Sequence, residues 1–353
     1  MFEIAINGRK IGRLHPPYII AEMSGNHNQT LDQAISILDA AANIGADAIK
    51  LQTYTADTLT IDSPRRDFII SDENSLWSGK SLYELYREAY TPWDWIELIF
   101  TEARKRNIDC FSSIFDEGSI DFLENLNTPA YKISSFENNH IPLIRKAAAT
   151  KKPLIISTGA SSEVNITEAV ENAREAGCKE LALLKCTSDY PAAISDSNLS
   201  CIPYLRDTYN CVVGLSDHTL GIAAALGGVA LGASIVEKHF IVSRDQGGVD
   251  SSFSADKAEL KQIVRDAKNV WGAIGKPDIH ISEREVASLM YKRSIYACKQ
   301  IKKGEIFTVN NIRVIRPGFG LHPRHYNELI GTVCHSDLTA GDRLDISFLT
   351  GGS

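Results

Sequence analysis

The stretch VVGLSDHTLG, residues 212–221, begins as an apolar run typical of a buried β-strand and then turns polar at the letters SDH. The same change occurs in SIVEKHF, residues 234–240, where a short apolar run ends in polar side chains. Six earlier segments share this pattern: YIIAEMS (18–24), DAIKLQT (47–53), DCFSSIF (109–115), AYKISS (130–135), PLIIST (153–158) and LALLKCT (181–187). An apolar strand with a polar C-terminal end is therefore the recurring unit of this part of the chain.

Helical patterns lie between these strands, for example LDQAISILDAAANIGA and WDWIELIFTEARKRN, with apolar residues at helical spacing. Apolar strands that alternate with helices predict a parallel sheet covered on both faces. Eight such units in about 250 residues indicate an α/β protein with a (β/α)8 TIM barrel. A doubly wound sheet is the alternative, but no GxGxxG motif follows the first strand.

The pattern changes near residue 275, and this change divides the chain. We expect a barrel domain over residues 1–275, which begins with a hairpin around Asn7-Gly8. A polar segment with a proline, residues 276–292, reads as a linker. Short strands and glycine turns follow, so residues 293–353 are expected to form a small β-rich domain.

The gap between the second and third predicted strands, residues 54–108, is longer than one helix needs. Its aromatic-rich middle, LWSGKSLYELYREAYTPWDW, predicts an inserted loop followed by a helix. Such an insert at the mouth of a barrel is placed to act as a lid or to set specificity.

Composition limits the function classes. A net charge of −7 argues against a nucleic-acid-binding protein, because such proteins carry basic surfaces. No run of about 18 apolar residues indicates a membrane span. The N-terminal letters MFEIAINGRKIG lack the pattern of a signal peptide, so a cytoplasmic location is expected.

In a TIM barrel the active site lies at the C-terminal ends of the strands. Four lysines fall at these ends, one each from the second, fourth, sixth and eighth strand: Lys50, Lys132, Lys185 and Lys238. Serine hydroxyls lie beside them: Ser113, Ser135, Ser157 and Ser216. Like charges gather only where an anion lies between them, so the pattern predicts a phosphate or carboxylate ligand.

His218 and His239 end two neighbouring strands, so their imidazoles are expected to meet. With Asp217 and either Glu22 or Glu137 nearby, this set predicts a divalent metal held by nitrogen and oxygen. Because no thiolate belongs to the set, Mn²⁺, Mg²⁺ or Co²⁺ is favoured over structural zinc. Open coordination positions would suit a Lewis-acid catalyst.

Two other classes stay open at this point. A barrel lysine, Lys132 or Lys185, is typical of an aldolase that works through a Schiff base without a metal, although the two histidines argue against it. A non-catalytic sugar-binding barrel, with the C-terminal domain as the working part, is the alternative outside enzymology.

Seven motifs in this order resemble the sialic acid synthase family: IAEMSGNHNQ, DAIKLQTYT, YKISSFE, IISTGA, LLKCTSDYP, GLSDHTLG and VEKHF. The C-terminal segment resembles the antifreeze-like (SAF, β-clip) domain of that family. Within the family, YTPWDW, GGVDSSFS and RPGFGLHPRHY resemble the pseudaminic acid synthase branch. The resemblance covers essentially the whole chain.

The resemblance implies a transferase that condenses phosphoenolpyruvate with an amino-sugar aldehyde, 2,4-diacetamido-2,4,6-trideoxy-L-altrose. Pseudaminic acid and phosphate are the implied products, with cleavage of a C–O bond. N-acetylneuraminate and legionaminic acid synthases are the alternatives within the family. The resemblance also implies a homodimer that exchanges SAF domains, in which Arg316 reaches the sugar site of the partner subunit.

The family's site residues carry over position by position. The metal ligands match His218 and His239, and manganese is the metal implied. The phosphoenolpyruvate contacts match Lys50, Ser113, Lys132, Ser135, Ser157, Ser188 and Ser216. The sugar-binding carboxylates match Glu137 and Asp250, the acid/base matches Glu22, and the aromatic of the sixth-strand motif is Tyr190.

Three positions depart from the family pattern. Ser188 stands where neuraminate enzymes carry asparagine, which weakens that contact and fits a different sugar. Val249 and Ile114 each stand where a proline is usual, so they loosen loop geometry without removing a reactive group. These changes affect the expected specificity more than the expected chemistry.

Overall fold

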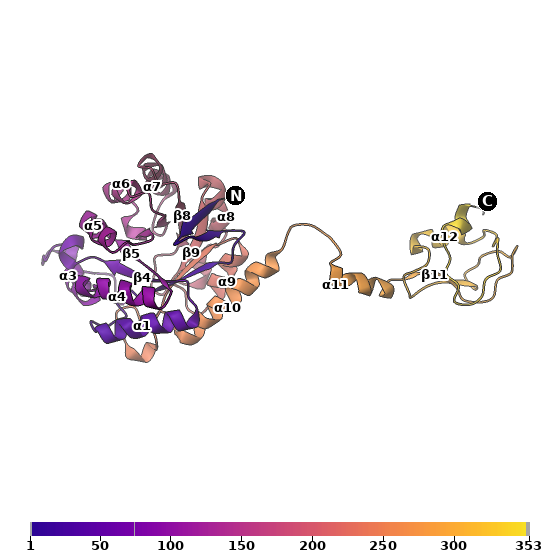
Figure 1. Ribbon diagram of the computed structural model, residues 1–353, viewed down its shortest axis with the longest axis horizontal. Helices are drawn as coiled ribbons and strands as arrows, with labels where there is room; N and C mark the ends of the chain where they lie inside the picture. The colour runs from indigo at the N-terminus through magenta and orange to yellow at the C-terminus, as the bar shows by residue number, and fades with distance from the viewer. Residues whose placement is uncertain (1, 74, 351–353) are drawn as a thin grey trace. The chain divides into compact units, whose positions relative to one another are not determined.

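The computed structural model describes residues 2–73 and 75–350, and the chain divides into two compact units (Figure 1). The first unit is Met1–Gly275 and the second is Lys276–Ser353. Each unit has its own hydrophobic core.

The first unit is a closed barrel of eight parallel strands. In chain order they are β3 (Tyr18–Glu22), β4 (Ala48–Thr53), β5 (Asp109–Ile114), β6 (Tyr131–Ile133), β7 (Leu154–Ser157), β8 (Leu181–Cys186), β9 (Val212–Asp217) and β10 (Ile235–His239). β10 closes the barrel by pairing with β3, so that His239 lies opposite Glu22. The predicted TIM barrel is therefore confirmed.

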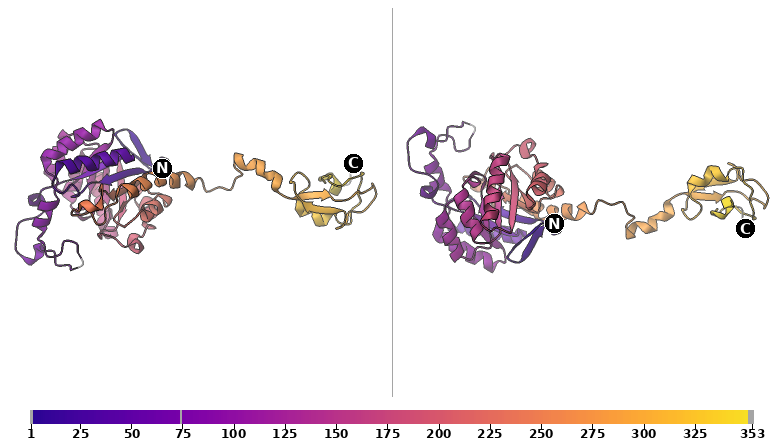
Figure 2. Two further views of the ribbon diagram at one scale, coloured as in Figure 1. Left: turned by 90° about the horizontal axis from the view of Figure 1, so that it is seen from below. Right: turned by 90° about the horizontal axis from the view of Figure 1, so that it is seen from above.

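Helices form a layer around the barrel (Figures 1 and 2). They are α1 (Leu31–Ile44), α4 (Trp93–Lys105), α5 (Glu117–Asn125), α6 (Ile141–Ala149), α7 (Glu163–Glu175), α8 (Cys201–Tyr209), α9 (Ala223–Ala230) and α10 (Lys257–Ile274). In α10 the buried residues Leu260, Ile263 and Ala267 recur every three or four positions and pack on the barrel. Asp256 caps the start of this helix, because its carboxylate accepts hydrogen bonds from first-turn N–H groups.

A hairpin closes the N-terminal end of the barrel. It consists of β1 (Glu3–Ile6) and β2 (Arg9–Gly12), joined at Asn7 and Gly8, whose φ angles are 46° and 78°. Positive φ at both turn positions matches the right-handed twist of the strands, which explains the Asn-Gly pair. The fully buried side chains Ile6 and Ile11 pack against the inward-facing residues at the N-terminal ends of the barrel strands.

The predicted insert after β4 is present as a loop with short helices. They are α2 (Ala56–Leu59), η1 (Arg66–Phe68) and α3 (Leu82–Ala89). Ser81 caps α3 in a reciprocal box with Glu84, which fixes where the helix begins. Three further 3-10 turns follow barrel strands: η2 (Ser135–Glu137), η3 (Ile194–Ser197) and η4 (Arg244–Gln246).

The second unit begins with α11 (Glu283–Val286) and η5 (Ala287–Tyr291). It continues with the antiparallel pair β11 (Ser294–Ala297) and β12 (Ile312–Ile315), then η6 (Pro323–His325), α12 (Tyr326–Leu329) and α13 (Ser347–Thr350). Its small core includes Ile295, Phe307 and Leu344. Among the described residues of both units, no helix is long and apolar enough to cross a membrane.

Candidate active site

The C-terminal mouth of the barrel encloses a cavity of about 470 Å³. The polar side chains that line it come mainly from the strand ends: Ser24, Lys50, Gln52, Lys132, Ser134, Ser135, Glu137, Ser157, Cys186, Tyr190, Ser216, His218, Glu237, His239 and Asp250. A volume of several hundred Å³ is the size that small-molecule sites use. Most of the residues expected at the site are thus brought to one cavity.

Lys50 is held on the floor of this cavity by two oxygen-bearing neighbours. Its Nζ lies 2.5 Å from Glu22 Oε2 and donates to Ser113 Oγ at 2.8 Å. Burial alone lowers the pKa of Lys50, but the carboxylates of Glu22 and Glu237 outweigh burial and raise it. Lys50 is therefore charged at neutral pH, although it is only 2% exposed.

Lys132 shares Glu237 with Lys50. Each ammonium lies 3.7 Å from Glu237 Oε1, which also accepts a hydrogen bond from Ser216 Oγ at 3.2 Å. Burial lowers the pKa of Lys132, and Glu237 offsets only part of this effect. The pKa of Glu237 is lowered even though burial opposes it, because both lysines are near. Two buried ammonium groups therefore lie close together, with Glu237 between them and Glu22 beside Lys50.

Glu137 and Asp250 reach the cavity from loops. Burial raises the pKa of Glu137 to about 7, and Lys132 opposes this only in part. Its Oε2 atom is buried without a hydrogen-bond partner. Asp250 instead accepts a hydrogen bond from Ser24 and lies beside His239; although burial opposes it, these contacts lower the pKa of Asp250. One carboxyl can therefore carry a proton at neutral pH, while the other stays ionised.

The two histidines meet at the cavity as expected. The ring centroids of His218 and His239 lie 5.3 Å apart at an interplanar angle of 67°. His218 Nδ1 lies 2.9 Å from the carbonyl oxygen of Thr187, which can only accept, so Nδ1 carries a proton and Nε2 is the nitrogen outside this contact. His239 Nδ1 is buried without a hydrogen-bond partner and lies 3.5 Å from Asp250 Oδ2.

These groups fit a divalent cation. Buried polar atoms without partners often mark the place of an ion or water, and here His239 Nδ1 and Glu237 Oε2 are both such atoms. Within the described residues, no three or more His, Cys, Asp or Glu side chains form a ready-made metal cage. Two imidazoles would therefore leave most coordination positions to water and substrate, as catalytic sites require.

The serines predicted at the strand ends lie near the lysines and histidines. Ser216 and Ser157 line the cavity, and the Oγ atom of Ser157 is buried without a partner. Ser135 also lines it and accepts a hydrogen bond from the backbone N–H of Gly159. A Cβ atom at Gly159 would lie 2.2 Å from Ser188 Oγ, so only glycine fits between these hydroxyls.

The structure corrects the expectation of four converging lysines, because only Lys50 and Lys132 converge. Neighbouring residues of a strand point to opposite faces. Lys185 lies between two inward-facing residues and points outward, where its Nζ donates to the carbonyl oxygen of Cys186 at 2.8 Å. Lys238 also points outward and pairs with Asp217 at 2.7 Å, so Asp217 is not available to the histidines.

Two inward-facing residues are missed by sequence reasoning. Glu237 lies two positions before His239, and Cys186 lies two positions after the inward-facing Leu184. Strand alternation gives both positions once one inward residue is known. Cys186 Sγ lies 3.8 Å from His218 Nδ1; although burial opposes it, His218 lowers the pKa of that thiol to about 6.

Aromatic side chains surround the histidines. The Tyr190 ring lies 4.4 Å from His218, and the Phe253 ring lies 5.0 Å from His239, measured between centroids. Trp77 from the insert lies 6.0 Å from Tyr190 and donates from Nε1 to the carbonyl oxygen of Val249 at 3.3 Å. The insert after β4 therefore meets the loop after β10 over the cavity.

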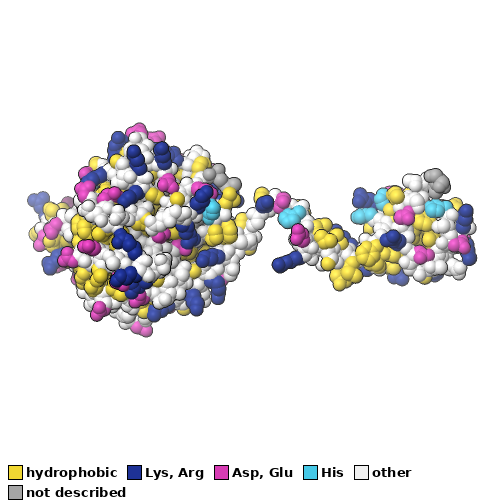
Figure 3. Space-filling model, in the orientation of Figure 1, with side chains coloured by type: hydrophobic (Ala, Val, Ile, Leu, Met, Phe, Trp, Pro, Cys, Tyr) yellow, Lys and Arg dark blue, Asp and Glu magenta, His cyan; other side chains and the backbone are white. Residues whose placement is uncertain are grey.

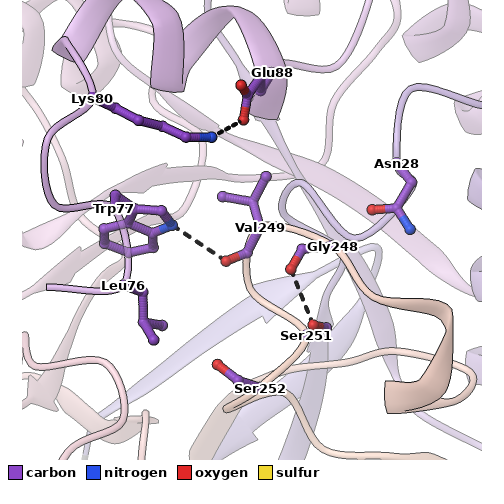
Figure 4. Close-up of a pocket in the computed structure, with 9 residues that line it drawn as sticks. All are labelled: Asn28, Leu76, Trp77, Lys80, Glu88, Gly248, Val249, Ser251 and Ser252. Atoms are coloured by element: carbon purple, nitrogen blue, oxygen red, sulfur yellow. Dashed lines mark hydrogen bonds and ion pairs between the residues drawn. The ribbon is translucent and has the colours of Figure 1, made fainter.

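An outer pocket lies on the other side of this contact (Figure 4). Trp77 and Val249 line both the outer pocket and the main cavity, so these two residues separate the two pockets. Leu76 and the ion pair of Lys80 with Glu88 line only the outer one. The two pockets are thus neighbours that share these two side chains.

Arg316 lies outside the barrel unit. It is an exposed residue directly after β12 in the second unit. On the face of the barrel unit drawn in Figure 3, basic and acidic side chains are interspersed. The lysines that line the cavity, Lys50 and Lys132, are instead almost fully buried.

Comparisons with known proteins agree with this geometry. The family model described as "NeuB family" matches residues 37–278, and the SAF domain model matches residues 292–349. The pseudaminic acid synthase of Campylobacter jejuni is 44% identical over 93% of this chain and 95% of its own length. That of Helicobacter pylori is 40% identical over 94% of this chain and 97% of its own. An N,N'-diacetyllegionaminic acid synthase of Campylobacter jejuni is 34% identical over 89% of this chain and 95% of its own.

Solved structures agree as well. The N-acetylneuraminic acid synthetase of Leptospira borgpetersenii, in complex with citrate, superposes with a TM-score of 0.72 at 31% identity, over 82% of this chain and 95% of that one. The spore coat polysaccharide biosynthesis protein SpsE of Bacillus subtilis gives a TM-score of 0.67 at 32% identity, over 97% of both chains. The barrel with its polar mouth, the SAF domain and these matches together show that this chain belongs to the NeuB family.

Proposed function

We propose that this chain is a pseudaminic acid synthase, which condenses phosphoenolpyruvate with 2,4-diacetamido-2,4,6-trideoxy-L-altrose and releases phosphate. The observation that carries the proposal is the convergence of Lys50 and Lys132 with His218 and His239 on one cavity. The relatives support the proposal, because two pseudaminic acid synthases match 93% and 94% of this chain.

Phosphoenolpyruvate carries a phosphate and a carboxylate, so its binding needs cationic groups that face it. We assign this role to Lys50 and Lys132, whose ammonium groups lie on either side of the Glu237 carboxylate at the floor of the cavity. Hydroxyl donors complete the anion site: Ser113, Ser135, Ser157, Ser188 and Ser216. Because the lysines are buried, their attraction for an anion is weakly screened by water and salt.

We assign the two imidazoles, His218 and His239, to a divalent cation, with Mn²⁺ proposed and Mg²⁺ or Co²⁺ as alternatives. The chemistry that such a cation supplies is polarisation of the aldehyde oxygen of the sugar. His218 is oriented for this role by its hydrogen bond to the Thr187 carbonyl oxygen, which leaves Nε2 to bind. Tyr190 packs on the His218 ring and holds its plane.

The reaction joins C3 of the enol to the aldehyde carbon, adds water at C2 and breaks the C–O bond to phosphate. Glu137, which has a pKa of about 7, can deliver a proton to the aldehyde oxygen as that atom becomes a hydroxyl. We assign Glu22 to take the proton from water, with Lys50 beside it at 2.5 Å. Asp250, ionised and held by Ser24, accepts hydrogen bonds from sugar hydroxyls.

We further propose that the protein acts as a homodimer with exchanged SAF domains, in which Arg316 completes the sugar site of the partner subunit. Residues 276–292 would then serve as the linker that lets residues 293–353 reach across. Both substrates are small polar molecules, which supports a cytoplasmic location.

The test is a phosphate-release assay with purified protein and phosphoenolpyruvate. The altrose-type sugar should give turnover that stops with EDTA and returns with Mn²⁺. N-acetylmannosamine and the legionaminic acid precursor should each give a rate at least about tenfold lower. If phosphate release is faster with either of these sugars than with the altrose-type sugar, the proposed substrate is wrong. Activity that survives EDTA, together with borohydride trapping of substrate on a lysine, would instead support a Schiff-base lyase.

A further inference from the structure

The cavity has a polar floor and an apolar wall, and different parts of the chain build them. Strand ends supply the floor, including Lys50, Lys132 and Glu237. The wall comes mainly from the insert after β4, with help from the loops after β5 and β6: Leu59, Ile70, Leu82, Leu85, Ala89, Phe115 and Phe136. The anion site and the insert therefore present opposite chemistry to one ligand.

Two tyrosines mark the boundary between floor and wall. The Tyr54 ring packs edge-on against Tyr86 at 5.9 Å and Phe115 at 5.0 Å between centroids. Burial raises the pKa of Tyr54, and the nearby carboxylate of Asp250 adds to this effect. The Trp77 indole N–H already donates to the Val249 carbonyl oxygen. The leucine, isoleucine, alanine and phenylalanine side chains of the wall therefore offer carbon surface to whatever lies against them.

The proposed chemistry fixes how the acceptor sugar lies between these two surfaces. The anionic groups of phosphoenolpyruvate must meet Lys50 and Lys132 on the floor, because those ammonium groups are the buried positive charges of the cavity lining. The aldehyde carbon of the sugar must reach C3 of the enol there. The far end of the open-chain hexose then extends away from the floor, toward the insert.

We propose that the apolar wall is a subsite for the C6 methyl end of the acceptor, and that it selects a 6-deoxy hexose over its 6-hydroxy counterpart. This inference rests on the proposed function. Leu82 and Leu59 are the specificity-determining residues that it names, because both line the cavity from the insert and are only half-buried. A methyl group against them loses no hydrogen bond, whereas a hydroxyl would leave its water partners unreplaced.

The expected preference for the 6-deoxy sugar can be estimated from the behaviour of other apolar pockets. An apolar pocket discriminates against an added hydroxyl by a factor of about 100 at most. The wild-type protein should therefore prefer the 6-deoxy sugar by about 10- to 100-fold in kcat/KM. A serine in the wall supplies a partner for the hydroxyl and removes carbon surface, so it should reduce this preference to about fivefold or less.

The experiment measures kcat/KM by phosphate release for the 6-deoxy and 6-hydroxy diacetamido sugars at saturating phosphoenolpyruvate. The variants are Leu82→Ser and Leu59→Ser, with Leu82→Met as the apolar replacement that should keep the wild-type preference. Leu76→Ser is the matched control, because Leu76 belongs to the same insert but lines only the outer pocket in Figure 4. An unchanged KM for phosphoenolpyruvate shows that each variant keeps the floor intact.

Loss of the preference in Leu82→Ser or Leu59→Ser, with retention in Leu82→Met and Leu76→Ser, supports the subsite. Equal kcat/KM for the two sugars in the wild-type protein would overturn the subsite and leave the proposed function standing. The same holds for a preference that both serine variants retain. Absence of phosphate release with any sugar would overturn the proposed function, and the subsite with it.

Discussion

The two ends of the barrel are built from the same eight strands but follow opposite rules. At the N-terminal end, Ile6 and Ile11 fill the mouth with carbon, and both are fully buried. At the C-terminal end, buried polar atoms such as Ser157 Oγ, Glu237 Oε2 and His239 Nδ1 have no hydrogen-bond partner. The first end therefore contributes stability, and the second keeps binding capacity that costs stability.

The contrast between the two ends shows where the chain keeps polar groups without hydrogen-bond partners. A buried polar atom without a partner typically costs about 1–3 kcal/mol, so a group of them around one cavity is expected where a ligand binds. The apolar end offsets this cost by hydrophobic burial. Substitutions at the two ends should therefore separate activity from stability.

The largest expected effect is at the polar end. His218→Ala or His239→Ala should lower kcat by at least about 1,000-fold, because each removes one of two imidazoles from the proposed cation site. Phosphate release measures this, and the urea midpoint should stay near that of the wild-type protein. Near-wild-type turnover in either variant would break the assignment of that end as the reaction site.

The second prediction compares two lysines that the sequence alone treats alike. Lys132→Met should reduce kcat/KM for phosphoenolpyruvate by about 100-fold, because it removes a buried, charge-assisted contact with an anion. Lys185→Met should change it less than about twofold, because Lys185 points out of the barrel. Equal losses of kcat/KM in the two variants would contradict the view that only the lysine that points into the barrel binds phosphoenolpyruvate.

The apolar end should show the reverse behaviour. Ile6→Ala removes carbon from a side chain that is 0% exposed and should lower the free energy of unfolding by about 2–5 kcal/mol. Urea denaturation measures this loss, while kcat and KM at 25 °C should remain near the wild-type values. A selective fall in kcat would mean that the hairpin also shapes the reaction site.

The smallest expected effect depends on pH. Burial raises the pKa of Glu137 to about 7 in the folded state, so its contribution to stability is full below about pH 4.5 and is lost as pH rises through 7. If Glu137→Gln matches the wild-type stability at pH 5, it should exceed it by up to about 2.5 kcal/mol at pH 8. Urea midpoints at the two pH values measure the difference, and Glu180→Gln serves as the control, because Glu180 lies at the other end of the barrel. A constant difference between the two pH values would contradict the raised pKa.

Much of this contrast is visible in the sequence. The apolar runs and their polar ends place every barrel strand within two residues, and Asn7-Gly8 predicts the hairpin. The direction of each side chain is not visible in the same way. Strands of a parallel barrel are buried on both faces, so no hydrophobic alternation distinguishes inside from outside. This is why Lys185 and Lys238 were expected in the cavity and Glu237 was not.

The apolar wall was also hidden, although the insert itself was predicted. Leu82 and Leu85 occupy the amphipathic helix α3, and such a pattern predicts burial without naming the partner surface. Only the folded chain shows that these residues face a cavity and not the helix layer.

The alternation along β10 also restricts how the gene can change. Deletion of one codon between Ile235 and His239 would turn the later side chains of the strand through half a revolution. A lysine would then enter the barrel, and an imidazole would be pressed into the surrounding helices. Changes of chain length are tolerated in the connections between strands, because these leave the order of facing residues intact. The insert after β4 is therefore where new substrate preferences can evolve without disturbing the chemistry beneath it.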